Sequence, residues 1–302
     1  MDRKQLIAIK NKYNDKVFDA TNIIIMCILL FIFVWPLWFV LIASFSDTTA
    51  LAKGEVILWP VGFSFDSYEM MFEYTAIWRG YLITTIVTGL GTFINLALSI
   101  CCAYPLSCKN FKPRKVITYL LMFTMYFHGG MIPTYMVVRN VKLLDSIWAM
   151  IIPSAISFYN CLIIRSYMMN SIPEELREAA TLDGANAAQY LFKVILPLSK
   201  PVLAVVGLYY MVSHWNNYYS ALLYIYDEKL YPLQSVLRRL LYMSSNIEVD
   251  SVTDPAELAR LYQLSVQMKY SVLIAATIPV LCIYPFIQKH FVKGMMVGAV
   301  KG

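Results

Sequence analysis

The chain has 302 residues, of which 59% are hydrophobic and only 15% are charged, and its mean hydropathy is +0.58. A soluble domain of this size has too much surface for so few charges, so the composition favours a membrane protein. The net charge of +6 is not gathered into a basic block with interleaved aromatic residues, which argues against nucleic acid as a partner.

Six apolar runs are long enough to cross a hydrocarbon core of about 30 Å, which takes about 20 helical residues. They cover residues 23–45, 81–106, 116–138, 147–164, 202–226 and 270–287. The first run is too long for the apolar part of a signal peptide and has no small-residue cleavage site after it, so we expect a retained spanning helix. The sequence predicts an all-α membrane protein with six transmembrane helices.

Lysine and arginine are concentrated in the amino-terminal segment, in the second and fourth connections and at the carboxyl end. Cytoplasmic loops carry such an excess, so both termini and the stretch 174–197 are predicted to be cytoplasmic. The connection 227–269 is then extracytoplasmic. Its Arg238, Arg239 and Tyr242 are interpreted as a solvated helix face.

The predicted spans contain few groups that could carry out chemistry. They hold no Asp, Glu or Lys, which an intramembrane enzyme or a proton-coupled carrier would need. None of the six cysteines has C-x-x-C spacing with a histidine, so packing roles are expected and no metal site is predicted. The ATP-binding pattern G-x4-G-K-[ST] is absent, so no cofactor and no ATP hydrolysis are expected in this chain.

The charged stretch EELREAATLDGANAAQYLFKVILP predicts two short amphipathic helices that meet at Gly184. Ser171 and Glu174 match the S-x-x-E capping box, and Gly184 after Asp183 is a helix-stop signal. One apolar stripe comprises Ile172, Leu176, Ala179 and Ala180, and the other comprises Ala188, Leu191, Phe192 and Ile195.

Two surroundings fit such helices, another protein or the surface of the lipid bilayer. The polar face carries four acids (Glu174, Glu175, Glu178 and Asp183) against one arginine, the wrong sign for an anionic leaflet. The charges therefore favour docking to a protein.

The same stretch resembles the EAA loop of binding-protein-dependent ABC importer permeases, EAA-x3-G-x9-I-x-LP. Glu178-Ala179-Ala180, Gly184 and Leu196-Pro197 stand in this spacing, with Val194 in place of the isoleucine. The resemblance implies a type I ABC importer permease fold and a coupling loop seated in a cleft of a cytoplasmic ATPase. It assigns that contact to Glu178, Ala179, Ala180, Asp183, Gly184, Leu196 and Pro197.

Further segments are similar to the smaller, maltose-type permease of the carbohydrate importers. They are WNNYYSALLYI, VRNVKLLDSIWAMIIP and the terminal FIQKHFVKGMMVGAVKG, while FHGGMIPTYMV resembles permeases for complex oligosaccharides. In that branch the glycine-rich tail reaches the ATPase dimer, which implies contacts by Lys301 and Gly302. A frayed terminus is the alternative.

The resemblance also implies partners and a location. A second homologous permease, an ATPase dimer that binds ATP and magnesium, an extracytoplasmic sugar-binding protein and membrane lipid are expected, in the bacterial cytoplasmic membrane. The predicted organisation is a cytoplasmic segment (1–22), a first helix with its outer loop (23–76), a permease core (77–288) with the coupling loop at 171–197, and a cytoplasmic tail (289–302). A permease for a non-sugar solute and a stand-alone carrier are the alternative functions.

A polar cluster interrupts the fifth apolar run. Its side chains should face protein or a water-filled passage, because amides are unfavourable against lipid. Ser213, Asn217 and Ser220 are predicted to share a helical face by their spacing. The cluster is interpreted either as hydrogen bonding between helices or as a lining of the translocation path; it comprises Ser213, Trp215, Asn216, Asn217 and Ser220.

Overall fold

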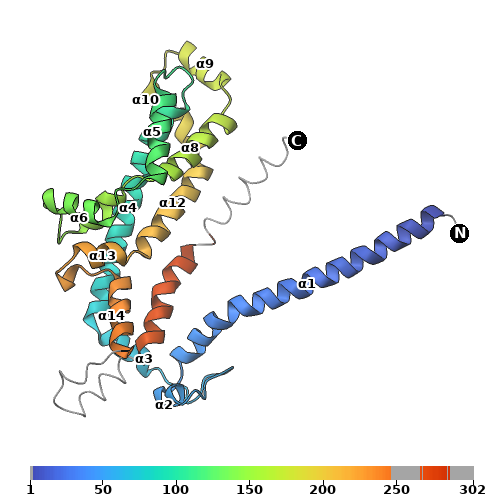
Figure 1. Ribbon diagram of the computed structural model, residues 1–302, viewed down its shortest axis with the longest axis vertical. Coiled ribbons are helices and arrows are strands. Elements are labelled where there is room, and N and C mark those ends of the chain that lie inside the picture. The colour runs from blue at the N-terminus through green and yellow to red at the C-terminus, as the bar shows by residue number, and fades with distance from the viewer. Residues whose placement is uncertain (1–2, 246–265, 267, 284, 286–302) are drawn as a thin grey trace. The chain divides into compact units, whose positions relative to one another are not determined.

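The computed structural model describes residues 3–245, 266, 268–283 and 285, and these residues form helices and connections without a β-strand. Figure 1 shows their order. The helices are α1 (Arg3–Ser44), α2 (Thr48–Ala52), α3 (Asp66–Glu73), α4 (Thr75–Ser107), α5 (Arg114–Tyr126), α6 (Met131–Asn140), α7 (Ile147–Ile151), η1 (Ile152–Ser154), α8 (Phe158–Ser171), α9 (Glu175–Leu182), α10 (Ala187–Tyr190), η2 (Leu191–Ile195), α11 (Leu196–Leu198), α12 (Lys200–Trp215), α13 (Tyr219–Tyr224), η3 (Glu228–Leu230) and α14 (Leu233–Ser245), followed by an apolar helix over Met268–Ile283.

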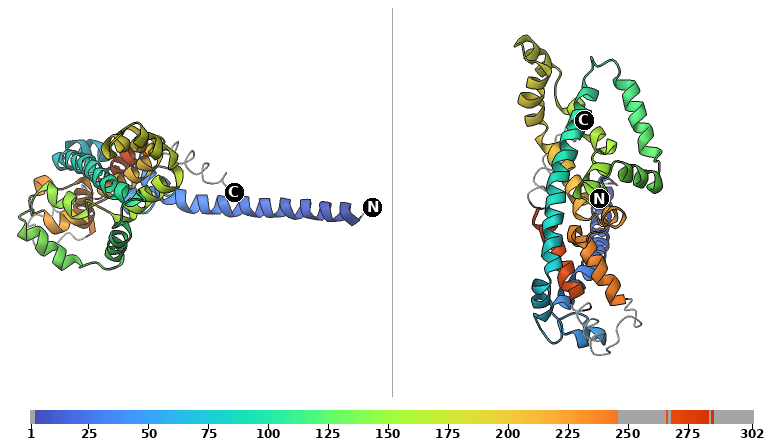
Figure 2. Two further views of the ribbon diagram at one scale, coloured as in Figure 1. Left: turned by 90° about the horizontal axis from the view of Figure 1, so that it is seen from above. Right: turned by 90° about the vertical axis from the view of Figure 1, so that its left-hand side faces the viewer.

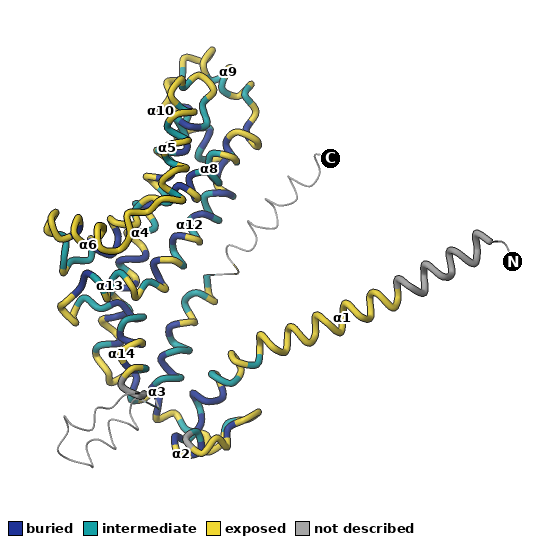
Figure 3. Tube along the Cα trace, viewed as in Figure 1, coloured by how far each residue is buried: buried dark blue, intermediate teal, exposed yellow. Residues whose placement is uncertain are grey.

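The chain divides into two compact units. Unit 1 comprises Met1–Met71 with Met243–Ile274, and unit 2 comprises Phe72–Tyr242 with Ala275–Gly302. In unit 1 a small core joins Ile42, near the end of α1, to Ala50 and Val56. The apolar residues of α1 between positions 17 and 34 are exposed, and Figure 3 colours this stretch accordingly. Such a surface suits lipid or another apolar helix.

Unit 2 is built around α4, with α8 and α12 packed along it (Figures 1 and 2). Polar side chains tie these helices together inside the apolar packing. The hydroxyls of Ser99 and Tyr210 lie 2.7 Å apart, and the amide of Asn95 donates to the Ser154 carbonyl at 3.2 Å. Hydrogen bonds of this kind help to hold helices together where the surroundings are apolar.

Two described helices are by themselves long and apolar enough to cross a membrane, Lys16–Ser44 and Thr75–Ser107. Three bent pairs also pass together, which raises the number to as many as five, and Met268–Ile283 is a shorter apolar helix. The first two predicted runs are thus continuous helices. The count of six spans and the side of the termini stay predictions.

The three central runs are not the straight helices that the sequence predicted. The run 116–138 bends by 111° between α5 and α6, and 147–164 bends by 52° between η1 and α8. The run 202–226 is broken where α12 ends at Trp215. The first break lies at Phe127-His128-Gly129-Gly130, where Gly130 has a φ of +88° that other residues rarely adopt. Hydropathy detects an apolar run but not a bend within it.

The length of α4 provides a scale for depth in unit 2. Near its start, the hydroxyl of Thr84 accepts the backbone N–H of Leu233 at 2.8 Å, which fixes the beginning of α14 there. Near its end, Ala103 and Tyr104 contact the α9–α10 region. At 1.5 Å per residue these two levels are about 30 Å apart, the thickness of a hydrocarbon core.

Gly91 marks the close approach of α4 and α12. A Cβ atom at this position would lie 2.5 Å from Nε2 of His214, whose ring is 4% exposed. We expect Gly91→Ala to destabilise the protein by about 1–3 kcal/mol, because the added Cβ would overlap the buried ring and force it to shift. Thermal unfolding of the purified chain in detergent measures this.

Gly89→Ala is the matched control, since a Cβ there meets nothing within 4 Å on the same helix. The double variant Gly91→Ala/His214→Ala, which vacates the ring's space, should recover much of the loss. A stability of Gly91→Ala equal to that of Gly89→Ala would show that the helices do not approach closely here.

Asp145 joins the α6–α7 connection to the end of α13. Its backbone N–H donates to the Tyr224 carbonyl at 2.8 Å, and its Oδ1 accepts the N–H groups of Tyr226 and Asp227, both at 2.9 Å. Asp145 has a φ of +57°, which aspartate tolerates better than most residues. The bonds from Asp227 and then Tyr226 lower the pKa of this carboxyl group.

A lowered folded pKa means that this stabilisation is present above the unfolded pKa and is lost as the pH falls through the folded pKa. We therefore expect amide exchange near residues 224–228, corrected for its intrinsic pH dependence, to accelerate in acid. Asp145→Asn keeps an accepting oxygen without a titrating group, so its protection should be less sensitive to pH. Identical pH profiles for the two proteins would contradict this role.

Candidate functional site

The predicted docking stretch forms α9 and α10, joined by a tight turn at Gly184. The N–H of Gly184 donates to the Thr181 carbonyl at 3.1 Å, and the N–H of Ala185 donates to the Ala180 carbonyl at 2.9 Å. These two bonds are those of a Schellman motif, whose turn residue has a left-handed conformation. Gly184 has a φ of +74°, so the predicted helix stop is confirmed.

The predicted capping box at Ser171 is wrong. Ser171 is the last residue of α8, and Glu174 precedes α9 without a side-chain cap, because Ile172-Pro173 separates the two helices. The capping box lies instead at α10: Oδ1 of Asn186 accepts the N–H of Gln189 at 2.8 Å, and Oε1 of Gln189 accepts the N–H of Asn186 at 2.9 Å. Asn186-x-x-Gln189 was the available sequence signal.

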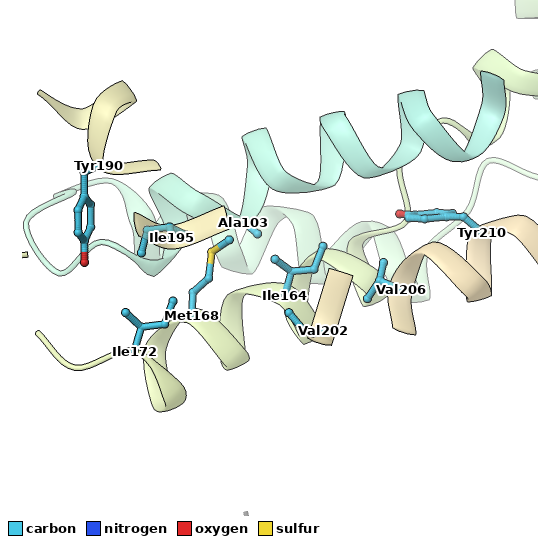
Figure 4. Packing of buried hydrophobic residues seen from close by; sticks show 9 residues of the cluster. All are labelled: Ala103, Ile164, Met168, Ile172, Tyr190, Ile195, Val202, Val206 and Tyr210. Atoms are coloured by element: carbon cyan, nitrogen blue, oxygen red, sulfur yellow. The ribbon is translucent and has the colours of Figure 1, made fainter. Parts of the chain in front are cut away.

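One apolar cluster holds both ends of this segment, and we call it the basal cluster. Figure 4 shows its buried side chains, which come from α4, α8, α10, η2 and α12. It comprises Ala103, Ile164, Met168, Ile172, Tyr190, Ile195, Val202, Val206 and Tyr210. Because α8 leads into the segment and α12 leads out of it, the cluster links the position of the segment to that of both helices.

Polar contacts reinforce this base. The Tyr104 hydroxyl donates to the Ala187 carbonyl at 3.1 Å, and the Tyr167 hydroxyl donates to the Leu198 carbonyl at 3.3 Å. Glu174 pairs with Arg177 and lies 3.6 Å from Lys109 on the connection after α4. The segment is thus anchored by groups outside its own helices.

The end of the segment bends back toward α12. Residues Leu191–Ile195 form a turn of π-helix, and the axis then turns by 80° between Ala187–Leu198 and Lys200–Trp215. Pro197 and Pro201 each remove a backbone donor at this bend. The predicted residue Leu196 is half-buried here and Pro197 is exposed.

Most residues of the α9–α10 segment are exposed, as Figure 3 shows. Glu178, Ala179, Asp183 and Gly184 are exposed and Ala180 is half-buried. Leu182 is 89% exposed and Phe192 is 67% exposed. The segment thus presents two large apolar side chains that this chain does not bury. Leu182 was missed from the sequence, although a leucine outside the apolar stripe was a usable signal.

A second site is a polar cavity of about 560 Å³ inside unit 2. It lies beside the middle of α4, at Asn95, between the two levels that are about 30 Å apart. Two helix breaks contribute to its wall, with His128 after α5 and Ser154 and Ser157 before α8. Oδ1 of Asn95 is buried without a hydrogen-bond partner among the described residues. Irregular backbone at membrane depth is tolerated where it lines a water-filled cavity.

The predicted polar cluster is divided between several environments. Ser213 lines the cavity and is exposed. Trp215 is buried, and its Nε1 donates to the Ala276 carbonyl at 3.0 Å. Asn216 ends α12 and is exposed.

The shared helical face predicted for Ser213, Asn217 and Ser220 is wrong, because α12 ends before Asn217. The Asn217 side chain accepts the N–H of Ser220 and donates to its hydroxyl, both at 3.0 Å, and so caps α13. Whether these residues line a path stays a prediction. Lys301 and Gly302 lie outside the described residues.

Three comparisons with known proteins bear on these sites. The sequence profile of the family "binding-protein-dependent transport system inner membrane component" matches residues 6–297. The polygalacturonan/rhamnogalacturonan transport system permease protein YtcP of Bacillus subtilis (strain 168) is 39% identical over 95% of this chain and 99% of its own length. The arabinooligosaccharides transport system permease protein AraQ of the same organism is 26% identical over 90% of this chain and 92% of its own.

A solved structure is also similar. It is a chain in the crystal structure of a bacterial ABC transporter involved in the import of the acidic polysaccharide alginate, with a TM-score of 0.83 and 30% identity. The match covers 92% of this chain and 98% of that chain. The all-α permease fold expected from the sequence is confirmed by this likeness.

Proposed function

The chain belongs to the family of binding-protein-dependent transport system inner membrane components, and we propose that it is a multi-pass permease subunit that carries an oligosaccharide across the bacterial cytoplasmic membrane. The relatives named above transport polygalacturonan, rhamnogalacturonan and arabinooligosaccharides, and the similar structure imports alginate. Polymers or oligomers of sugars are common to all of them. This shared class is the basis for the proposed substrate.

The observation that carries the mechanism is the exposed segment on its buried base. We assign to Glu178, Ala179, Ala180, Asp183, Gly184, Leu196 and Pro197 a contact with a separate ATPase dimer, which would bind ATP and magnesium. Leu182 joins them, because its side chain is 89% exposed in this chain. A stand-alone carrier would have no use for such an apolar docking surface, so this observation favours an importer subunit.

Transport follows from moving the segment. When ATP closes the ATPase dimer, the docked segment would move with it, and the basal cluster would carry the motion into α8 and α12. These helices contribute Asn160, Tyr210 and Ser213 to the lining of the mid-depth cavity. ATP can change the passage only through its differing affinity for the two states of the dimer. A tight link between segment and helices is therefore required.

The cavity supplies a suitable passage for a sugar. Its lining offers amides, hydroxyls and the rings of His128 and His214, but no Lys, Arg, Asp or Glu. These groups can form the hydrogen bonds that water makes to sugar hydroxyls. Because they carry no fixed charge, they would not hold an ionised solute tightly. We place Ser213 in this path and assign Asn217 and Ser220 to its outer end; Trp215 supports the wall from behind.

The remaining partners follow from the family. A second permease would close the passage, and an extracytoplasmic binding protein would deliver the sugar. Membrane lipid would surround the outer helices. The tail residues Lys301 and Gly302 would add contacts to the ATPase.

Leu182→Asp tests the docking surface. A charge placed in an apolar contact should lower ATP-dependent uptake at least about tenfold, since burying a leucine contributes about 1.5–3 kcal/mol. Uptake of labelled oligosaccharide into proteoliposomes containing the whole importer is the measurement. Leu182→Met is the matched control and should retain both uptake and the normal amount of assembled importer.

Substitutions at Gly184 distinguish the backbone conformation that the turn needs from the space that a docking partner leaves around it. Within the chain a Cβ at Gly184 meets nothing within 4 Å, so only its φ and its docking partner restrict the residue. Gly184→Asn tolerates the left-handed turn but adds bulk, Gly184→Ala strains the turn, and Gly184→Asp adds bulk and charge. We expect Gly184→Asp to abolish uptake while insertion into the membrane continues; normal uptake would count against docking.

A further inference from the structure

A pocket of about 270 Å³ lies between α13 and α14 in unit 2. Three tyrosines and two arginines line it, together with Glu228: Tyr218, Tyr231, Tyr242, Arg238 and Arg239. The opposite face of α14 is buried through Leu233, Val236, Leu237 and Leu240. The sequence predicted a solvated helix face at Arg238 and Arg239. This face is exposed, and it also forms one wall of the pocket.

The two arginines have different surroundings. Arg239 pairs with Glu228, so its charge is already matched. Arg238 lies over the Tyr218 ring, 5.1 Å from its centroid, and pairs with no carboxylate in the part of the chain that the structure describes. Stacking on the ring holds the guanidinium in place while leaving its N–H donors available. Among the described residues, the pocket thus has one positioned cation that no carboxylate pairs with.

A further polar group in the wall lacks a partner. The hydroxyl of Ser235, one turn before Arg238 on α14, is buried without a hydrogen bond among the described residues. The tyrosine rings supply flat apolar surfaces beside these polar groups. A ligand that suits this wall has a carboxylate for Arg238, a hydroxyl for Ser235 and an apolar ring face for a tyrosine.

The position of the pocket determines which solutes reach it. The start of α14 is bonded to Thr84, and the docking segment rests at Ala103, about 30 Å further along α4. If the docking segment faces the cytoplasm, the pocket faces the other side of the membrane. It therefore lies where an arriving solute first meets this subunit.

We propose that this pocket binds one uronic acid residue of an acidic oligosaccharide before it enters the passage. The inference rests on the proposed function and names the substrate class of the importer. Its volume suits a single sugar ring, and the charge of Arg238 would select a uronate over a neutral hexose. Since the mid-depth cavity has no Lys or Arg, discrimination for the charge lies at the entrance.

The test compares trigalacturonate with its fully methyl-esterified form, which has the same rings without the charge. Binding to the full-length chain in lipid nanodiscs is followed by saturation-transfer NMR. We expect the acid to bind at least about tenfold more tightly than the ester, and Arg238→Gln to abolish this preference. Arg238→Lys should restore only part of it, because a lysine lacks the fork that matches a carboxylate.

Tyr119→Leu is the control, an exposed tyrosine on α5 that lies outside the pocket. Equal binding of acid and ester, or an acid preference that survives Arg238→Gln, would overturn the proposal. So would a weakened association of the extracytoplasmic binding protein in Arg238→Gln without any effect on sugar binding, because the pocket would then recognise a protein. In each of those cases, the proposed function would still stand if the uptake of a neutral oligosaccharide depended on Leu182.

Discussion

The basal cluster is the interaction on which the rest of this structure depends. An exposed segment of two short helices can transmit a movement only if its base is rigid, since helices this short are not stable alone. The cluster provides that base by burying Ile172 at the entry and Ile195 at the exit against α4, α8 and α12. The helix ends, closed by the turn at Gly184 and the box at Asn186, then fix the shape of the exposed tip.

A second constraint acts inside the membrane. Backbone groups there must find partners, so a bend in a spanning helix is tolerated where protein or water surrounds it. The bends at His128-Gly129-Gly130 and before Phe158 both border the mid-depth cavity. Bends and cavity are thus two aspects of one arrangement, because the helices are interrupted where the cavity lies.

The sequence predicted the fold class and the two short helices that meet at Gly184, because both depend on local signals. Hydropathy marks apolar runs, and Asp183-Gly184 marks a helix stop. The failures depended on tertiary structure. Pro173 displaced the expected cap from Ser171, and the end of α12 removed the common face of Ser213, Asn217 and Ser220.

The cavity and the arginine pocket could not be predicted, because each gathers residues that are distant along the chain. Asn95, His128 and Ser157 come together only when α5 and α8 pack on α4. Arg238 meets Tyr218 across the connection between α13 and α14. A face that looks merely solvated in a helical pattern can therefore be one wall of a site.

The central claim is that a partner ATPase binds the exposed side of α9. A photoreactive benzoylphenylalanine placed at Leu182 in the assembled importer tests it most directly, with the same group at exposed Tyr119 as the reference. The account predicts a crosslink from position 182 to the ATPase whose yield changes when ATP is bound, and none from position 119. Crosslinks from position 182 to lipid alone, or to a protein outside the cytoplasm, would contradict it.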